Sequence, residues 1–263
     1  MTEKQDKIFI GTSGWQYGHW QGIFYPENLP TKDWLNYYSQ KFQTVEINSS
    51  FYHLPRKTTF ENWAARVPEK FLFSIKVWRR ITHFKKLKNI KKDLKVFFER
   101  VLALKEKLGP FLLQFPSNFQ AKEENIKRLR QFGQFIREDL RLNLSKFTKC
   151  HFALEFRHQS WFNKKVYQIL KKYNLALCWA DTPYYPYEEI VTADYVYIRL
   201  HGHTELYASK YTKKQLKDYA KKIQKLIDQG KTVYVYFDND AYGHAIENVQ
   251  ELQRLILKYQ VLS

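Results

Sequence analysis

The chain has 263 residues, of which 44% are hydrophobic and 17% aromatic, so a large core can be buried. Lysine and arginine number 44 against 26 aspartates and glutamates, which gives a formal net charge of +18. No run approaches the roughly 20 apolar residues that span a bilayer, and residues 1–7 are polar, so we expect no membrane partner, no signal peptide and a cytoplasmic location.

Charge and cysteine content limit the partners further. A positive field attracts phosphate-bearing molecules, whereas lysines that coat solvated helix faces would give the same total without any partner. Only the position of the charges can decide between these two interpretations. The two cysteines, Cys150 and Cys178, lie inside apolar runs, so we expect small buried residues rather than a disulfide or a zinc site.

Apolar stretches alternate with helical patterns along the whole chain. Eight stretches are typical of strands: Ile8–Thr12, Thr44–Asn48, Phe71–Val77, Phe111–Phe115, His151–Arg157, Leu175–Asp181, Tyr195–His201 and Thr232–Asp238. Helical patterns lie between most of them: Lys32–Lys41, Thr58–Arg66, Lys91–Leu108, Glu123–Arg137, Lys164–Tyr173, Lys213–Gln229 and a last helix around 246–256. Residues 182–193, rich in proline and tyrosine, show no helical pattern.

Local signals mark the ends of two of these helices. Thr212 and Gln215 have the spacing of a capping box, and Gly230 is expected to end the helix that they start. Gly109 is expected to stop the helix that begins at Lys91.

Strands that alternate with helices predict a parallel sheet with right-handed crossovers. Eight such units close into a TIM-type (β/α)8 barrel, which we predict as a single domain over 1–263. A doubly wound open sheet is the alternative. No Gly-x-Gly-x-x-Gly follows the first strand, which counts against a dinucleotide-binding fold.

Side-chain alternation predicts which strand residues face the barrel interior, because the outer face must be apolar to pack under helices. In 195–201, Val196, Ile198 and Leu200 suit the helix layer, so Arg199 and His201 face inward. The same reasoning turns the following polar residues inward: Glu46, Asn48, Ser74, Lys76, Gln114, His151, Glu155, Arg157, Tyr195, Tyr197, Tyr234, Tyr236 and Asp238.

The inward faces become more polar toward the carboxyl ends of the strands. Buried charges cost several kcal/mol unless they are paired or solvated, so a shared cavity at the C-terminal mouth explains them economically. The alternative is an internal salt-bridge network, for instance between Glu155 and Arg199, that only plugs the barrel.

The loops at the same end are rich in aromatic residues. Trp15, Tyr17, Tyr52 and Trp161 could stack on a base or a sugar ring, or could simply close the top of the core. A basic run from Arg79 to Lys95, opposed only by Asp93, lies on the mouth side and favours a phosphate-rich partner.

Six local sequences occur in an order that closely resembles the YecE-like family, a domain of unknown function (number 72). They are Ile10-Gly-Thr-Ser-Gly-Trp15, Glu46-Ile-Asn-Ser-Ser-Phe-Tyr52, Gln114-Phe-Pro116, Glu155-Phe-Arg-His-Gln-Ser-Trp161, Arg199-Leu-His-Gly202 and Tyr236-Phe-Asp-Asn239. The resemblance covers about 9–257 and implies a TIM-type barrel but no reaction. Gln159 and Asp238 depart from the proline and asparagine frequent in that family.

The favoured hypothesis is a hydrolase or lyase that acts on a phosphorylated, nucleotide-like or nucleic-acid ligand. The predicted catalytic residues are Glu46, Glu155, His201 and Asp238. The predicted ligand-binding residues are Thr12, Trp15, Tyr17, Asn48, Tyr52, Lys76, Gln114, Arg157, Trp161, Asp181, Arg199 and Asn239. Among them, Lys76, Arg157 and Arg199 would hold phosphate.

Three other hypotheses stay open at this stage. One is a nucleic-acid-binding protein without enzymatic activity, which would use the basic run and the aromatic mouth. Another is a glycoside hydrolase-like enzyme with Glu46 and Glu155 as paired carboxylates. The third is a divalent metal, although no compact ligand motif is present. The available ligands are His201, His203, Glu46, Glu155, Asp181 and Asp238. The sequence indicates no other cofactor and no oligomeric state.

Overall fold

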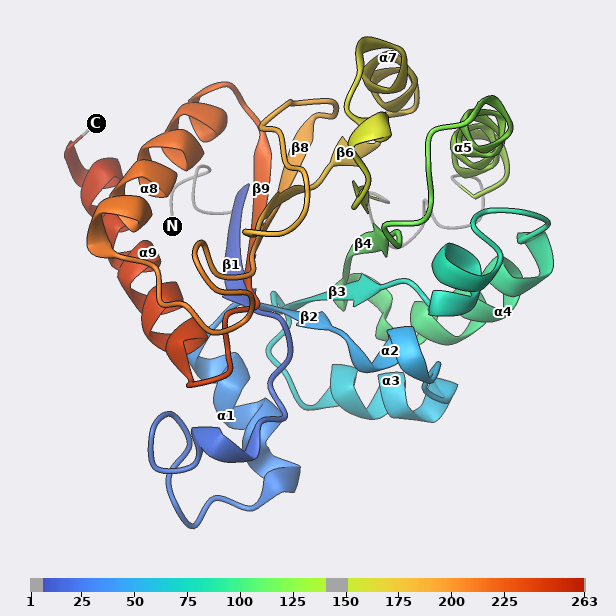
Figure 1. Ribbon diagram of the computed structural model, residues 1–263. Helices are drawn as coiled ribbons and strands as arrows, with labels where there is room; N and C mark the ends of the chain where they lie inside the picture. Colours follow the sequence, from blue (N-terminus) through green and yellow to red (C-terminus); the bar gives the residue numbers. More distant parts are fainter. Residues whose placement is uncertain (1–6, 141–150, 263) are drawn as a thin grey trace.

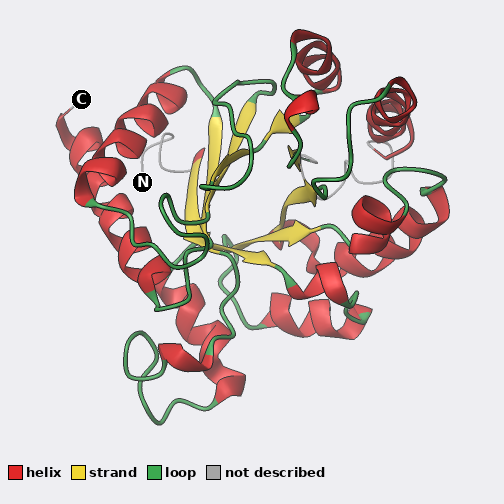
Figure 2. Cartoon of the chain, in the orientation of Figure 1, coloured by secondary structure: helices red, strands yellow, loops and turns green. Residues whose placement is uncertain are grey.

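The computed structural model describes residues 7–140 and 151–262, in which parallel strands are surrounded by helices (Figures 1 and 2). The strands are β1 (Ile8–Thr12), β2 (Thr44–Ile47), β3 (Leu72–Lys76), β4 (Leu108–Gln114), β5 (Phe152–Glu155), β6 (Ala176–Leu177), β7 (Trp179–Asp181), β8 (Tyr195–Leu200) and β9 (Thr232–Phe237). They hydrogen-bond in two parallel sheets, ordered β1-β9-β8-β7 and β2-β3-β4-β5-β6.

Two features connect the sheets. Ser13 and Glu46, just after β1 and within β2, form a parallel bridge. At this seam Gly11 lets the backbones approach, because a Cβ there would lie 2.1 Å from the Thr44 carbonyl oxygen. On the opposite side β6 and β7 are one strand interrupted at Cys178, whose amide still donates to the Leu154 carbonyl. The fold is therefore a TIM-type (β/α)8 barrel, as predicted.

The helices follow the predicted order. They are α1 (Trp34–Lys41), α2 (Ser49–Tyr52), α3 (Lys57–Ala65), α4 (Lys91–Val101), α5 (Glu123–Phe135), α7 (Lys164–Tyr173), α8 (Lys213–Asp228) and α9 (His244–Leu262). The capping box of Thr212 and Gln215 is present at the start of α8, and Gly230, with φ +80°, follows its end. As predicted, 182–193 contains no helix.

Several predicted elements differ from the structure in their bounds, two of them most clearly. The α-helix predicted over Lys91–Leu108 ends at Val101. A 3-10 helix, Leu102–Lys107, follows it, and Lys105 within this second helix has φ +52°. Gly109 does not stop a helix but lies in β4, where a Cβ would meet the Phe73 carbonyl oxygen at 3.0 Å. The strand predicted over 175–181 is split because its first half pairs with β5 and its second half with β8.

The core has two separate parts, on the two sides of the strands. The outer part, under the helices, contains Val196, Ile198 and Leu200 as the alternation predicted. The inner part combines four tyrosines of β8 and β9 with small residues of β5 to β7: Tyr195, Tyr197, Tyr234, Tyr236, Ala153, Ala176, Cys178 and Ala180. Large side chains from one side of the barrel thus fill the space that small ones leave on the other.

Further predictions concern the cysteines and the membrane. Cys178 is buried with a free thiol, as expected, while Cys150 lies outside the described residues. Within the described parts of the chain, the helices all fall short of the length and apolarity needed to cross a bilayer.

Candidate functional site

A buried arginine, Arg199 at the end of β8, lies at the centre of the polar residues inside the barrel. Its side chain is 0% exposed, and its Nη1 donates to Glu155 Oε2 at 2.8 Å. Its Nη2 donates to Ser13 Oγ and to Asp238 Oδ2, each at 3.0 Å. We call Ser13, Glu46, Glu155, Tyr197, Arg199, His201 and Asp238 the Arg199 cluster.

Glu46 binds Arg199 with both carboxylate oxygens. Arg199 Nε donates to Oε2 at 3.1 Å and Nη2 donates to Oε1 at 2.8 Å, a two-pronged geometry that fits a guanidinium and a carboxylate. Tyr197 donates to Oε2 at 2.6 Å, and Ser13 donates to Oε1. Glu46 is 0% exposed, so its four acceptor positions are used within the protein.

Glu155 on β5 is the second carboxylate of the cluster. Besides Arg199, it accepts hydrogen bonds from Gln114 Nε2 at 2.7 Å and from Arg157 Nε at 3.1 Å, both on Oε1. Burial alone would raise the pKa of Glu155, but the charges of Arg199 and Arg157 hold it well below its usual value. Glu155 is therefore an ionised structural partner of two arginines.

Asp238 forms the side of the cluster that solvent reaches, with the buried His201 beside it. His201 Nδ1 lies 2.9 Å from Asp238 Oδ2, and Arg199 Nη1 lies 3.0 Å from His201 Nε2. Because arginine can only donate, Nε2 accepts from Arg199, while Nδ1 lies at ion-pair distance from Asp238 without an aligned hydrogen bond. Burial raises the pKa of Asp238, yet Arg199 and His201 bring it below its ordinary value. The Asp238 side chain is 15% exposed, which leaves it accessible at the mouth.

The two glutamates suggested as a glycosidase pair both bind one guanidinium. Arg199 uses Nε and Nη2 toward Glu46 and Nη1 toward Glu155, so arginine atoms occupy the space between the two carboxylates. A glycosidic bond would need that same space. The alternative prediction of an internal salt bridge between Glu155 and Arg199 is confirmed at 2.8 Å.

Lys76, on β3, projects inward beside this cluster and is only 9% exposed. Its Nζ lies 4.5 Å from the centre of the Phe51 ring, a cation–π distance. Among the described residues, Nζ has neither a hydrogen-bond acceptor nor an ion-pair partner. Burial, followed by repulsion from Arg199, lowers the pKa of Lys76 to about 8.

Arg157 is the other cation at the mouth, with its side chain 15% exposed. Only its Nε is bonded to Glu155, and its guanidinium carbon lies 4.4 Å from the centre of the Tyr185 ring. The Tyr207 hydroxyl is a close electrostatic neighbour of the Arg157 guanidinium. We call Phe51, Lys76, His83, Arg157, Tyr185 and Tyr207 the rim group.

Three predicted ligand-binding residues lie on the outer side of the strands instead. Thr12 contacts the Tyr38 hydroxyl of α1 at 2.8 Å, and Asp181 accepts from Tyr219 of α8 at 3.1 Å. Asn239 is 0% exposed and donates to Ser209 and Asn248, tying the loop before α8 to α9. The structure does not bring these three side chains to the Arg199 cluster.

Two predicted aromatic residues are core residues. Trp15 is 4% exposed and packs edge-on against Trp63 and Phe73. Trp161 is 0% exposed and stacks on Phe156 at 4.4 Å. Neither indole has a face open to a ligand.

The other predicted residues lie at or near the mouth. Tyr17 donates to the Ser13 carbonyl at 2.5 Å, and Asn48 donates to Ser13 Oγ at 2.7 Å. Tyr52 is 57% exposed. Ser13 was missed, although it follows Phe9 and Gly11 in the strand alternation and would face inward by the same reasoning. His83 lies in the π-helical turn Arg80–Phe84 and Tyr207 in a loop, and strand alternation gives no signal for either.

The basic run from Arg79 to Lys95 is partly neutralised. Arg80 and Lys85 both bind the carboxylate of Asp93, each at 2.6 Å. Arg79, in contrast, lies between two exposed rings, 5.7 Å from that of Tyr52 and 5.2 Å from that of Phe84. Arg79 and the exposed rings of Tyr52 and Phe84 therefore form one cationic and aromatic surface toward solvent.

The metal hypothesis lacks a ligand set within the described residues, where no three His, Cys, Asp or Glu side chains group around one point. His203 lies apart from His201 because it binds the outward-facing Asp181 at 3.1 Å. The carboxylates of the cluster are bound to arginine instead.

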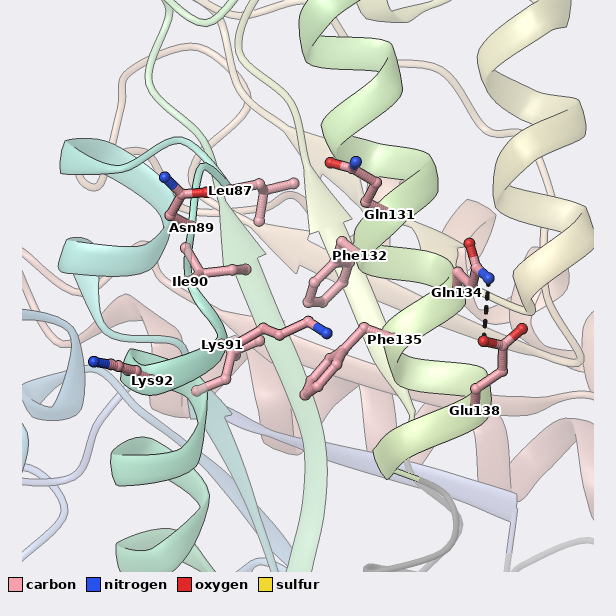
Figure 3. A pocket seen from close by; sticks show the side chains of 11 residues that line it. Leu87, Asn89, Ile90, Lys91, Lys92, Gln131, Phe132, Gln134, Phe135 and Glu138 are labelled. Carbon is pink, nitrogen blue, oxygen red and sulfur yellow. Dashed lines mark hydrogen bonds between the residues drawn. The ribbon is translucent and has the colours of Figure 1, made fainter.

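A separate hollow lies in the helix layer. Figure 3 shows this groove of about 660 Å³ between α4 and α5, with Ile90, Lys91, Phe132 and Phe135 among its walls. The Lys91 ammonium lies 5.9 Å from the Phe135 ring centre. None of the predicted site residues lines the groove, so it is distinct from the barrel mouth.

Comparison with known proteins agrees with this geometry. The family model described as "Protein of unknown function DUF72" matches residues 9–262. The UPF0759 protein YunF of Bacillus subtilis is 27% identical over 95% of this chain and 94% of its own length. A DUF72 family crystal structure from Thermotoga maritima superimposes with a TM-score of 0.82 and 27% identity, over 95% of this chain and 99% of that one. A model that matches nearly the whole chain, with a barrel of the same shape, shows that the protein belongs to the DUF72 family.

Proposed function

We propose that the C-terminal mouth of the barrel binds a phosphorylated, nucleotide-like small molecule and that the protein acts on it as a lyase or hydrolase. The proposal rests on a difference in hydrogen bonding between two kinds of cation at this site. Arg199 is fully buried and fully bonded, whereas Lys76 and Arg157 reach the mouth with donors to spare. An anionic ligand is the natural partner of such donors.

This difference changes the roles assigned to individual residues. Arg199 has five N–H donors, and all of them point at protein acceptors, so it holds the site together rather than a phosphate. Arg157 uses Nε toward Glu155 and also hydrogen-bonds with the Tyr207 hydroxyl, and its remaining Nη donors can bind a phosphate. Tyr185 and Tyr207 beside it offer surfaces for a sugar or a base.

The acid and base of the reaction are expected among groups that remain accessible. Glu46 is enclosed by four bonds and cannot reach a substrate. Asp238 is ionised and partly exposed, and its Oδ1 is not occupied by Arg199, so we assign it the role of general base. His201 orients Asp238 from 2.9 Å.

The test is ligand-induced stabilisation of the purified protein with phosphate, ribose 5-phosphate and AMP. A ligand at 100 times its Kd should add about 2.7 kcal/mol to the free energy of unfolding and raise Tm by several degrees. Arg157→Ala should abolish this increase, whereas Arg254→Ala, on the exposed face of α9, should retain it. An unchanged Tm with all three ligands, or equal increases in Arg157→Ala, would refute the proposal.

A second candidate function is non-catalytic binding of nucleic acid. It is favoured by the exposed rings of Tyr52 and Phe84 on either side of Arg79, since bases stack on such surfaces. Filter binding of single-stranded DNA at several salt concentrations tests it. Affinity should fall steeply with salt and be lost in Arg79→Ala; no retention even at low salt would exclude this function.

A further inference from the structure

The rim group contains a lysine in an unusual state. Lys107, the natural comparison, is partly buried and donates to the Ala64 and Val67 carbonyls at 2.6 Å each. Lys76 is more deeply buried, at 9% exposed, but no described acceptor lies within hydrogen-bond distance of its Nζ. The Lys76 Nζ is not among the fully enclosed polar atoms, so its ammonium is left to solvent at the mouth, where an entering molecule can reach it.

The charges around Lys76 favour its free amine. Burial lowers the pKa of Lys76 most, and repulsion from Arg199 lowers it further. The carboxylates of Glu155, Glu46 and Asp238 raise this pKa but offset only part of the lowering. With a pKa of about 8, a quarter or so of the amine is deprotonated near pH 7.5, against about a thousandth for an ordinary lysine. A free amine that reaches the mouth of the barrel is a good nucleophile toward carbonyl carbon.

A second titratable side chain, His83, contacts the same aromatic ring. The ring of His83 contacts Phe51 edge-on, with ring centres 4.8 Å apart, and its Nδ1 lies 3.0 Å from Thr82 Oγ1. Burial, and then the charges of Lys76 and Arg157, lower the pKa of His83 to about 4. The imidazole is therefore neutral at pH 7, and its Nε2 can accept and return a proton.

We propose that Lys76 forms an imine with the carbonyl carbon of a phosphorylated aldehyde or ketone whose phosphate is held by Arg157. This inference rests on the proposed function and names its substrate class. The free amine nitrogen bonds to the carbonyl carbon, and the carbonyl oxygen leaves as water. Its two hydrogens are the proton that the Lys76 ammonium released to solvent before the attack and one that the nitrogen loses after it. The product is a protonated imine, which withdraws electrons from neighbouring bonds as a lyase requires.

Reductive trapping tests the inference on the full chain. The protein is incubated near pH 7.5 with glycolaldehyde phosphate and cyanoborohydride, which delivers hydride to the C=N carbon and leaves a stable secondary amine. Intact mass and peptide mapping should then show one adduct per chain at Lys76, formed about tenfold or more faster than at any other lysine. Lys76→Arg should lose this adduct, and Lys172→Arg, an exposed control on α7, should behave as wild type.

Two further arms separate the inference from the proposed function. If glycolaldehyde phosphate without reductant raises Tm but no adduct maps to Lys76, Lys76 is not a nucleophile and phosphate binding stands. If neutral glycolaldehyde labels Lys76 as fast as its phosphate ester does, phosphate recognition fails while the nucleophile stands. Labelling spread evenly over surface lysines overturns the imine. Peptide mapping of the wild-type chain distinguishes these outcomes even if the Lys76 variants fold poorly.

Discussion

Glu46 and Arg199 bind each other through two parallel contacts, 2.8 Å between Oε1 and Nη2 and 3.1 Å between Oε2 and Nε, and neither side chain is exposed. They come from β2 and β8, on nearly opposite sides of the barrel. A charge pair in this position is stabilising only while both partners are present, because each alone would be a buried, uncompensated charge.

Arg199→Met should therefore lower the free energy of unfolding by about 3–5 kcal/mol, since three carboxylates lose their common cation. Urea unfolding followed by circular dichroism measures the change. Arg254→Met, on exposed α9, should change it by less than about 0.5 kcal/mol. A loss below about 1 kcal/mol for Arg199→Met would show that the cluster is not a buried charge network.

Acid should destabilise the protein through the lowered pKa values of Glu155 and Asp238. In the folded chain both remain ionised below the unfolded value of about 4, so their stabilisation is complete above that pH and is lost as pH falls through their folded values. Asp238→Asn should flatten the dependence of unfolding free energy on pH below about 5. Identical slopes in urea titrations of variant and wild type would contradict this assignment.

Lys76 should reduce stability at neutral pH. Its folded pKa of about 8 lies below the ordinary 10.5, so the folded state disfavours the ammonium. The cost is greatest below pH 8 and disappears as pH rises from 8 to 10.5. Lys76→Met should then be more stable than wild type by up to about 3 kcal/mol at pH 7, with the advantage vanishing near pH 10.5. A Lys76→Met protein less stable than wild type at pH 7 would mean that an unseen partner satisfies the ammonium.

Gly11→Ala should open the seam between β1 and β2. The added Cβ would lie 2.1 Å from the Thr44 carbonyl oxygen, a backbone atom that cannot move without disturbing β2. We expect a loss of about 3 kcal/mol or more in unfolding free energy, or failure to fold. Gly18→Ala is the matched control, because nothing lies within 4 Å of a Cβ there, and Tm should stay within about a degree of wild type. Equal Tm values for both variants would refute the close approach.

Strand alternation predicted most of the barrel interior because the outer face must be apolar under helices. It placed Glu46, Glu155, Arg199 and His201 together, and the structure joins them by contacts of 2.8 to 3.6 Å. The same rule applied to β7 would have turned Asp181 outward, since Trp179 is its alternate neighbour in the outer core.

Other features of the site depend on tertiary contacts. Whether Trp161 caps the core or faces a ligand is decided by its stacking on Phe156, from the same loop, and by its bond to the Phe119 carbonyl. Tyr207 reaches the mouth because its backbone has φ +63°, in a loop without any periodic pattern. Whether Arg199 has N–H donors left for a ligand also depends on tertiary contacts. The sequence shows only a cation at this position, whereas the contacts show that all its donors are used.

The four tyrosines that cross the barrel below Arg199 determine from which end a small molecule can enter the barrel. Together with the small residues opposite, they leave the interior packed from the amino ends of the strands up to the cluster, so the barrel is a cup and not a tube. Any molecule that binds at the cluster must therefore enter and leave through one opening. If two substrates react here, the one that sits deeper must arrive first and depart last.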